Sequence, residues 1–220
     1  MRYSIDTDRI SLSNLKKRIE ETDLVPSRQP LLGGIGQKFQ ALESCGITTF
    51  SSLREELKNK KHMEALSIKT GISIEYLVLL RREIESYLPK PFPLTEFDWL
   101  PQNEIAKLGV AGIRNSEELF EALESFVDTS NLQDKTGIDP AVLEDLIRLV
   151  ALTRVQWTSP TLARVYIEAS YKSVDKLASA QAEELHSAIQ NINTGGRYFK
   201  GQIGLRDIQR LIKAAEYLVE

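Results

Sequence analysis

The chain repeats itself at an interval of 66 residues, and this feature constrains its fold more than any other. When residues 38–88 are shifted by 66 positions onto residues 104–154 without gaps, 14 of the 51 aligned pairs are identical. Ordinary residue frequencies would give about 3 identities by chance. A weaker third copy follows within residues 157–220. Self-similarity of this kind is typical of an array of small, related units that pack against one another.

Hydrophobic residues in the longer segments recur with the period of a helix. They follow the i, i+3, i+4, i+7 spacing of a helix that buries one face, as in the set Ile208, Leu211, Ile212, Ala215 and Leu218. No segment shows the convincing alternation of a half-buried strand. The sequence therefore predicts an all-α fold of many short helices, with an N-terminal helix at about residues 12–21.

Glycines and capping residues mark the helix ends at equivalent positions of the copies. Gly46 and Gly112 each follow a short predicted helix, where glycine closes the last turn in a left-handed conformation. Three residues further on, Thr49 and Asn115 are residue types that commonly cap a following helix. A second pair of glycines, 25 residues further along, repeats the pattern. Each copy therefore predicts two helix pairs separated by tight turns.

These signals divide the chain into four parts. Residues 1–30 hold the N-terminal helix and a connector, and residues 31–92 and 93–156 form the first and second units. Residues 157–220 form a divergent third unit, in which a loop insertion at residues 193–201 interrupts the pattern. Proline-containing segments mark the boundaries between the units.

Composition limits the classes of function. The net charge is −3, so no global positive field attracts the protein to nucleic acid or to an acidic membrane surface. The charge is unevenly spread, because residues 1–91 carry 15 Lys and Arg against 12 Asp and Glu, whereas residues 92–220 carry 13 against 19. The first part of the chain is therefore mildly basic.

The single cysteine, Cys45, cannot form an intramolecular disulfide, and the two histidines have no zinc-ligand spacing. Cys45 precedes a helix-ending glycine and is expected to be a small buried residue. Residues 1–12 lack the apolar core of a secretory signal, and no stretch approaches the roughly 18 apolar residues of a membrane span. We therefore expect a cytoplasmic protein with no membrane partner, no metal and no other cofactor.

Several segments resemble a known structural family. Leu32–Lys38 reads LGGIGQK and is followed by AL at residues 41–42 and CGITTFSSL at residues 45–53. With Ser159–Arg164 and Glu168–Val174 of the third copy, they resemble the glycine-hydrophobe-glycine and Ala-Gly-Ile-Thr-Thr pattern of helix-hairpin-helix proteins. The tandem arrangement is similar to a bacterial family known only as a domain of unknown function and related to those proteins. The resemblance implies an array of about three helix-hairpin-helix-like units.

In helix-hairpin-helix proteins the glycine hairpin presents backbone N–H groups at a helix N-terminus to a phosphate. The resemblance implies such a site at four residues of the first unit, namely Gly34, Ile35, Gly36 and Lys38. In the other units Trp99-Leu100-Pro101 and Trp157-Thr158-Ser159 stand in place of the glycines, and a tryptophan would crowd a phosphate. The same glycines are also common in an ordinary tight turn between helices.

Two further groups of residues are candidates for binding. Cations of the first unit could line a face for a nucleic-acid backbone, although a charged run is commonly only a solvated surface; they are Lys58, Lys60, Lys61, Arg81 and Arg82. Aromatic and cationic residues of the later units could bind a partner or stack on bases, and as a structural alternative they pack in the core or form a mobile loop. These are Trp99, Trp157, Arg197 and Tyr198.

Two hypotheses of function follow. The first is a non-enzymatic module that binds a DNA or RNA backbone weakly and without sequence preference, and it predicts that the cations gather on one face with the Gly34–Gly36 hairpin. The alternative is a protein–protein scaffold or adaptor, which predicts an exposed apolar patch or groove near Trp99 or Trp157. An enzyme would need a deep pocket with clustered ionisable groups, and no catalytic motif is present. We therefore expect no catalytic residues.

Overall fold

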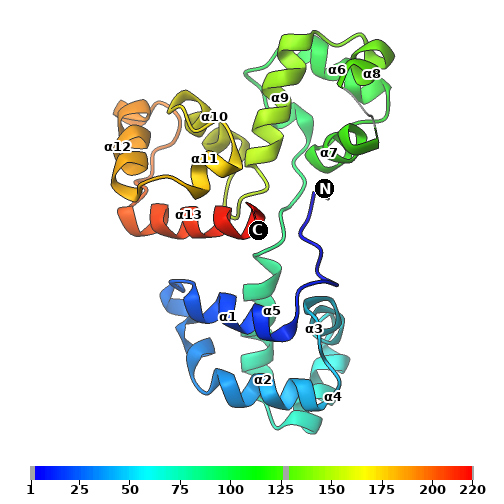
Figure 1. The fold of residues 1–220 in the computed structure, drawn as a ribbon, viewed down its shortest axis with the longest axis vertical. Helices are drawn as coiled ribbons and strands as arrows, with labels where there is room; N and C mark the ends of the chain where they lie inside the picture. The colour runs from blue at the N-terminus through cyan, green and yellow to red at the C-terminus, as the bar shows by residue number, and fades with distance from the viewer. Residues whose placement is uncertain (1–2, 126–128, 220) are drawn as a thin grey trace. The chain divides into compact units, whose positions relative to one another are not determined.

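The computed structural model describes residues 3–125 and 129–219 (Figure 1). Over these residues the regular structure is helical, with two isolated β-bridges and no strand. This confirms the predicted all-α fold class. The chain divides into two compact parts. We call Ile5–Leu88 the N-terminal domain, and we call the part formed by Tyr3, Ser4 and the chain from Pro89 onward the C-terminal domain.

The N-terminal domain packs short helices around one hydrophobic core. Helix α1 occupies the predicted position of the N-terminal helix, and the Ser11 hydroxyl caps it by accepting a hydrogen bond from the Asn14 N–H at 3.1 Å. The elements are α1 (Leu12–Glu21), the 3₁₀ helix η1 (Pro26–Leu32), α2 (Ile35–Ser44), α3 (Phe50–Glu56), α4 (Lys60–Thr70) and α5 (Ile74–Glu85).

The C-terminal domain has a single core that runs through both the second and the third predicted unit. Its elements are η2 (Leu94–Glu96), α6 (Gln102–Val110), α7 (Ser116–Ser125), α8 (Thr129–Thr136), α9 (Pro140–Leu152), α10 (Pro160–Glu168), α11 (Val174–Ala178), α12 (Ala182–Ile192), η3 (Thr194–Gly196) and α13 (Leu205–Val219). Among the helices described in the two domains, none is long and apolar enough to cross a membrane.

The helix positions follow the sequence interval. Helices α6, α7 and α9 begin 67, 66 and 66 residues after α2, α3 and α5. Gly46 and Gly112 have φ angles of +86° and +89°, and Gly71 and Gly137 have +71° and +65°. Ser170, aligned with Gly46 and Gly112 in the third copy, also has a left-handed φ of +71°. These left-handed residues close helices, as the glycine pattern predicts.

Short stretches of antiparallel backbone pairing also recur in the two domains. In the N-terminal domain Ile10–Leu12 and Thr48–Phe50 are joined by two main-chain hydrogen bonds of 2.9 Å each. In the C-terminal domain Phe92–Leu94 and Arg114–Ser116 are joined by two bonds of the same length. Each pairing fixes the segment that precedes the first or second unit onto the turn inside that unit.

Candidate functional site

The Gly33–Gly36 hairpin forms a tight turn at the N-terminus of α2. Gly34 has a φ of +65° and no side chain caps the helix, so the first N–H groups of α2 have no intrahelical or capping partner. The Lys38 ammonium folds back, donates to the Gly33 carbonyl and lies 4.3 Å from the centroid of the Tyr76 ring. The Tyr76 hydroxyl in turn donates to the Leu31 carbonyl at 2.9 Å. Lys38 is thus held against the hairpin by the chain itself.

Two of the other predicted cations, Lys58 and Arg81, lie away from this hairpin. Figure 1 shows α2 running from the hairpin at its N-terminal end to α3 and α4 at its C-terminal end. Lys58 and Arg81 meet there, where the Arg81 guanidinium donates to the Lys58 carbonyl at 3.5 Å. Lys60 and Lys61 lie in the first turn of α4, and Arg82 is exposed on α5. Lys58 and Arg81 therefore lie at the opposite end of α2 from Gly34–Gly36.

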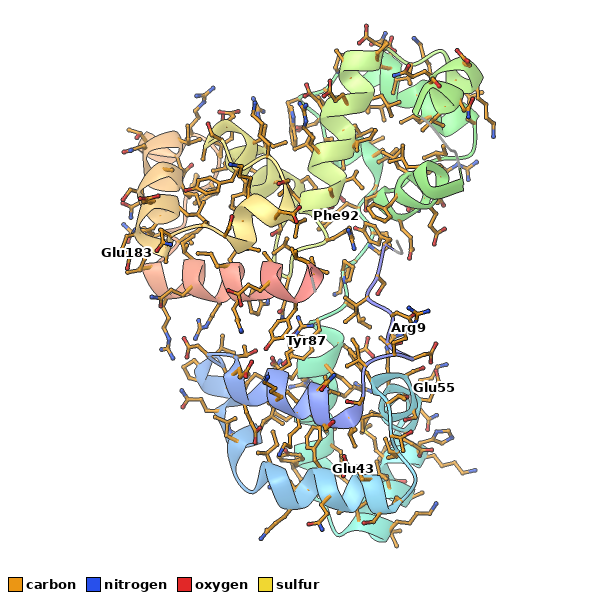
Figure 2. All side chains as sticks on the ribbon, in the orientation of Figure 1. Arg9, Glu43, Glu55, Tyr87, Phe92 and Glu183 are labelled. Carbon is orange, nitrogen blue, oxygen red and sulfur yellow. The ribbon has the colours of Figure 1, made fainter. Side chains whose placement is uncertain are left out.

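Lys58 and Arg81 instead line a cleft of about 420 Å³ that also contains acidic residues. Glu85 accepts two hydrogen bonds from Arg54, at 2.6 and 3.1 Å, and Lys58 lies 3.4 Å from Glu55 (labelled in Figure 2). Because carboxylates accompany the cations, much of the positive charge in this cleft is already neutralised.

Three of the four predicted partner-binding residues do come together, around an arginine of α10. The Arg164 guanidinium carbon lies 5.0 Å from the Trp99 ring centroid and 5.1 Å from the Tyr198 ring centroid. The Arg197 guanidinium carbon lies 4.9 Å from the same Tyr198 ring. Cations over aromatic faces at these distances are attracted by the ring quadrupole. We call Trp99, Arg164, Glu168, Arg197 and Tyr198 the aromatic–arginine cluster.

Glu168 joins the two sides of the aromatic–arginine cluster. It accepts hydrogen bonds from the Tyr198 hydroxyl at 2.6 and 2.7 Å and from Arg164 Nε at 3.0 Å. Partial burial raises the pKa of Glu168, but these bonds and the charges of Arg164 and Arg197 outweigh it and hold the pKa below its usual value. The bond to Glu168 raises the pKa of Tyr198. At neutral pH Glu168 is therefore ionised and Tyr198 is neutral. The carboxylate then accepts the hydrogen bonds of both Tyr198 and Arg164, which holds the two side chains in place.

The insertion loop positions Tyr198 through Asn193. The Asn193 side chain accepts hydrogen bonds from the backbone N–H groups of Tyr198 and Phe199, at 2.9 and 3.1 Å, and donates to the Phe199 carbonyl at 2.9 Å. Trp99 is anchored on the other side by an edge contact with the buried Phe97, with ring centroids 5.8 Å apart. The cluster is thus built in advance of any binding event.

Sequence reasoning missed three residues of this arrangement, Arg164, Glu168 and Asn193. The four-residue spacing of Arg164 and Glu168 on a predicted helix was the available signal, since such pairs face one another. Nothing in the spacing links them to Trp99 or Tyr198, which lie 65 and 34 residues from Arg164.

Trp157, the fourth predicted partner-binding residue, makes none of the ring contacts that define the cluster over the described residues. It has a left-handed φ of +66° and is 52% exposed, whereas Gln156 and Thr158 beside it are buried. A bulky residue in this conformation is strained, so the surrounding chain forces the indole outward.

Cys45 corrects one expectation, because its side chain is exposed rather than buried. It follows directly after α2 and precedes the left-handed Gly46, and at this turn it faces solvent.

Over the described residues, no group of three or more His, Cys, Asp and Glu side chains is arranged to hold a metal ion.

The fold and the cluster together define an all-α protein of short, capped helices with a preorganised aromatic and cationic surface. The chain belongs to the family described as Domain of unknown function (DUF4332), whose model matches residues 100–218, more than half of the sequence. The matched region includes Arg164, Glu168, Arg197 and Tyr198, and Trp99 lies immediately before it. A search of curated proteins and a search of solved structures each gave no match.

Proposed function

We propose that the protein is a non-enzymatic interaction module that binds another protein through the aromatic–arginine cluster. The observation that carries this proposal is the stacking of Arg164 between Trp99 and Tyr198, with Glu168 fixing both Arg164 and Tyr198. Tryptophan, tyrosine and arginine are the residue types that dominate binding energy at protein interfaces. Side chains held in place before binding also lose less conformational entropy when a partner docks.

The charge of the cluster indicates the chemistry of the partner. Two guanidinium groups, of Arg164 and Arg197, surround a single carboxylate, that of Glu168. Arg197 is the more exposed of the two arginines. We expect a partner that brings a carboxylate to Arg197 and an apolar side chain to the ring of Tyr198 or Trp99, since guanidinium binds carboxylate in a planar, bidentate geometry.

The test compares Arg197→Glu with Lys200→Glu, which makes the same charge change on the same loop but outside the cluster. Proteins that crosslink to the purified wild-type protein in a cell extract are identified, and their affinities are then measured with each variant. We expect Arg197→Glu to weaken binding about tenfold or more, as for an interface hot spot, and Lys200→Glu to have little effect. Equal binding by both variants and the wild type would overturn the proposal.

A second candidate function is weak binding of a nucleic-acid backbone at the hairpin. The specific support is the N-terminus of α2, where left-handed Gly34 leaves the first N–H groups without a side-chain cap. Such a terminus can donate to a phosphate. The partial neutralisation of the Lys58 and Arg81 cleft makes this the weaker of the two proposals.

Salt-dependent titration against single- and double-stranded DNA and RNA tests the hairpin. Gly36→Pro removes one N–H from the first turn, where proline is tolerated, and Gly36→Ala is the matched control because it keeps the donor and has open space for its Cβ. We expect affinity to fall steeply between about 50 and 200 mM salt and to fall further in Gly36→Pro and Lys38→Glu. An absence of binding at the lower salt concentration contradicts this function.

We also propose that the units are helix-hairpin-helix-like repeats and that the protein acts in the cytoplasm. The shared 66-residue offset of helix starts and the left-handed residues at Gly46, Gly112 and Ser170 support the repeat proposal. The single cysteine supports a reducing compartment.

A further inference from the structure

Tyr3 belongs to the core of the C-terminal domain, although the whole N-terminal domain separates it from that domain in sequence. Its side chain is only 1% exposed. The residues that surround it all come from the chain after Leu88, namely Lys90, Ser116, Phe120 and Arg154. A short segment that is remote in sequence therefore fills a site that the rest of the domain forms.

Both ends of the tyrosine are recognised by specific polar contacts. The Tyr3 hydroxyl lies 2.8 Å from Ser116 Oγ and 3.3 Å from the Lys90 carbonyl, to which it donates. The Tyr3 main-chain carbonyl accepts a hydrogen bond of 2.9 Å from Arg154 Nε. The Tyr3 ring meets Phe120 edge-on, with centroids 5.9 Å apart. The hydroxyl, the ring and the main-chain carbonyl of Tyr3 thus each have a specific partner in the domain, whereas burial of an apolar side chain needs only packing contacts.

The site is also held in place without Tyr3. Ser116 is fully buried, and its hydroxyl accepts a hydrogen bond of 2.9 Å from the Phe92 N–H. Arg154 is 7% exposed, and its guanidinium carbon stacks 4.4 Å from the Phe120 centroid. Without Tyr3, the buried Ser116 hydroxyl would lose its contact with the phenol hydroxyl. The buried Arg154 Nε would lose the main-chain carbonyl to which it donates. Both groups would then favour a replacement ligand with the same chemistry.

We infer that the C-terminal domain contains a binding site for a tyrosine-bearing peptide, which the chain occupies with its own Tyr3. The ligand needs a phenol hydroxyl for Ser116 and a main-chain carbonyl for Arg154. The same segment added as a separate peptide binds once the internal copy is removed. This site is distinct from the aromatic–arginine cluster, and the inference does not depend on the proposed function.

The experiment uses the full chain with Tyr3→Ala and a fluorescent synthetic peptide of residues 1–8, MRYSIDTD. Fluorescence polarisation of the peptide is expected to show that it binds to the full chain carrying Tyr3→Ala. Binding to the wild-type chain should be at least about tenfold weaker, because its tethered segment competes at an effective concentration in the millimolar range. A peptide carrying Tyr3→Phe is expected to bind about 2- to 10-fold less tightly, as for one lost hydrogen bond. A peptide carrying Tyr3→Ala should not bind.

Circular dichroism first establishes whether the Tyr3→Ala chain is folded. If it is folded, failure of the peptide to bind it more tightly than the wild-type chain would overturn the inference. If it is unfolded, the peptide is expected to restore the helical signal in a concentration-dependent manner, and failure to do so would overturn it equally. Adding Ser116→Ala to the Tyr3→Ala chain should reduce the preference for tyrosine over phenylalanine in the peptide, since only the Lys90 carbonyl then remains as a partner of the phenol hydroxyl.

Discussion

Replacing Glu83 by alanine is expected to lower the free energy of unfolding of the N-terminal domain by about 3–5 kcal/mol. Glu83 on α5 is only 5% exposed, and its Oε2 lies 3.4 Å from Arg28 Nε in η1. Arg18 of α1, itself 9% exposed, stacks its guanidinium carbon 3.9 Å from the ring centroid of Tyr87, which is labelled in Figure 2. Burial raises the pKa of Glu83, while the nearby Tyr87 hydroxyl and the charges of Arg28 and Arg18 oppose that rise.

The large expected cost comes from what the substitution leaves behind. Without the carboxylate, Arg28 loses the opposite charge that it faces at 3.4 Å, and the buried Arg18 loses a nearby negative charge. A charge in a poorly solvated place is costly. Glu85→Ala is the matched control on the same helix. Its carboxylate is 41% exposed and pairs with Arg54 at 2.6 Å, so its loss should cost less than about 1 kcal/mol.

Urea denaturation followed by circular dichroism measures both variants. Trp99 and Trp157 both lie in the C-terminal domain, so tryptophan fluorescence reports on that domain separately. The Glu83→Ala substitution should shift the transition seen by circular dichroism. Similar losses for Glu83→Ala and Glu85→Ala would show that burial does not strengthen the Glu83 network.

The helices were predictable from the sequence because their signals are local. Ser11, Thr49, Ser73, Asp139 and Ser159 each cap the helix that begins one residue later. A cap is decided by the few residues that follow it, so the residue types alone carry the information. The 66-residue offset extends the same local signals to a second copy.

The candidate sites were only partly predictable, because they depend on contacts between distant residues. Tyr3 reaches Ser116 and Arg154, which lie 113 and 151 positions along the chain. No periodicity or spacing encodes such a contact. Trp99 and Tyr198 were recognised as candidates by residue type, but only the fold brings them to Arg164. Conversely, Lys38 and Lys58 looked like one basic set in sequence, but Lys38 packs against Gly33 and Tyr76 whereas Lys58 lies beside Glu55 and Arg81.

Alkaline pH is expected to lower the free energy of unfolding, because several tyrosines are buried in their neutral form. Burial raises the pKa of Tyr76 from 10.0 to about 12. Burial also raises the pKa values of Tyr87 and Tyr166. In the unfolded chain these hydroxyls ionise near the ordinary value of about 10. Between these values the folded state binds more protons than the unfolded state.

The sign of the effect follows from this difference. The contribution of each buried tyrosine is fully present below about pH 10 and is lost as the pH rises through the folded-state pKa. For Tyr76 the shift corresponds to up to about 3 kcal/mol, lost between about pH 10 and about pH 12. The free energy of unfolding, measured by urea denaturation at a series of pH values, should therefore fall steeply over this range.

Tyr76→Phe distinguishes this mechanism from general alkaline effects such as the loss of lysine charge. The variant keeps the ring on which the Lys38 ammonium lies but loses the hydroxyl that donates to Leu31. At neutral pH it should be less stable than the wild type by about 1 kcal/mol, the net value of one hydrogen bond. Above pH 10 its stability should fall less steeply, because one ionisable buried group is gone. Parallel pH profiles for the two proteins would assign the alkaline loss to other groups, since only the Tyr76 hydroxyl differs between them.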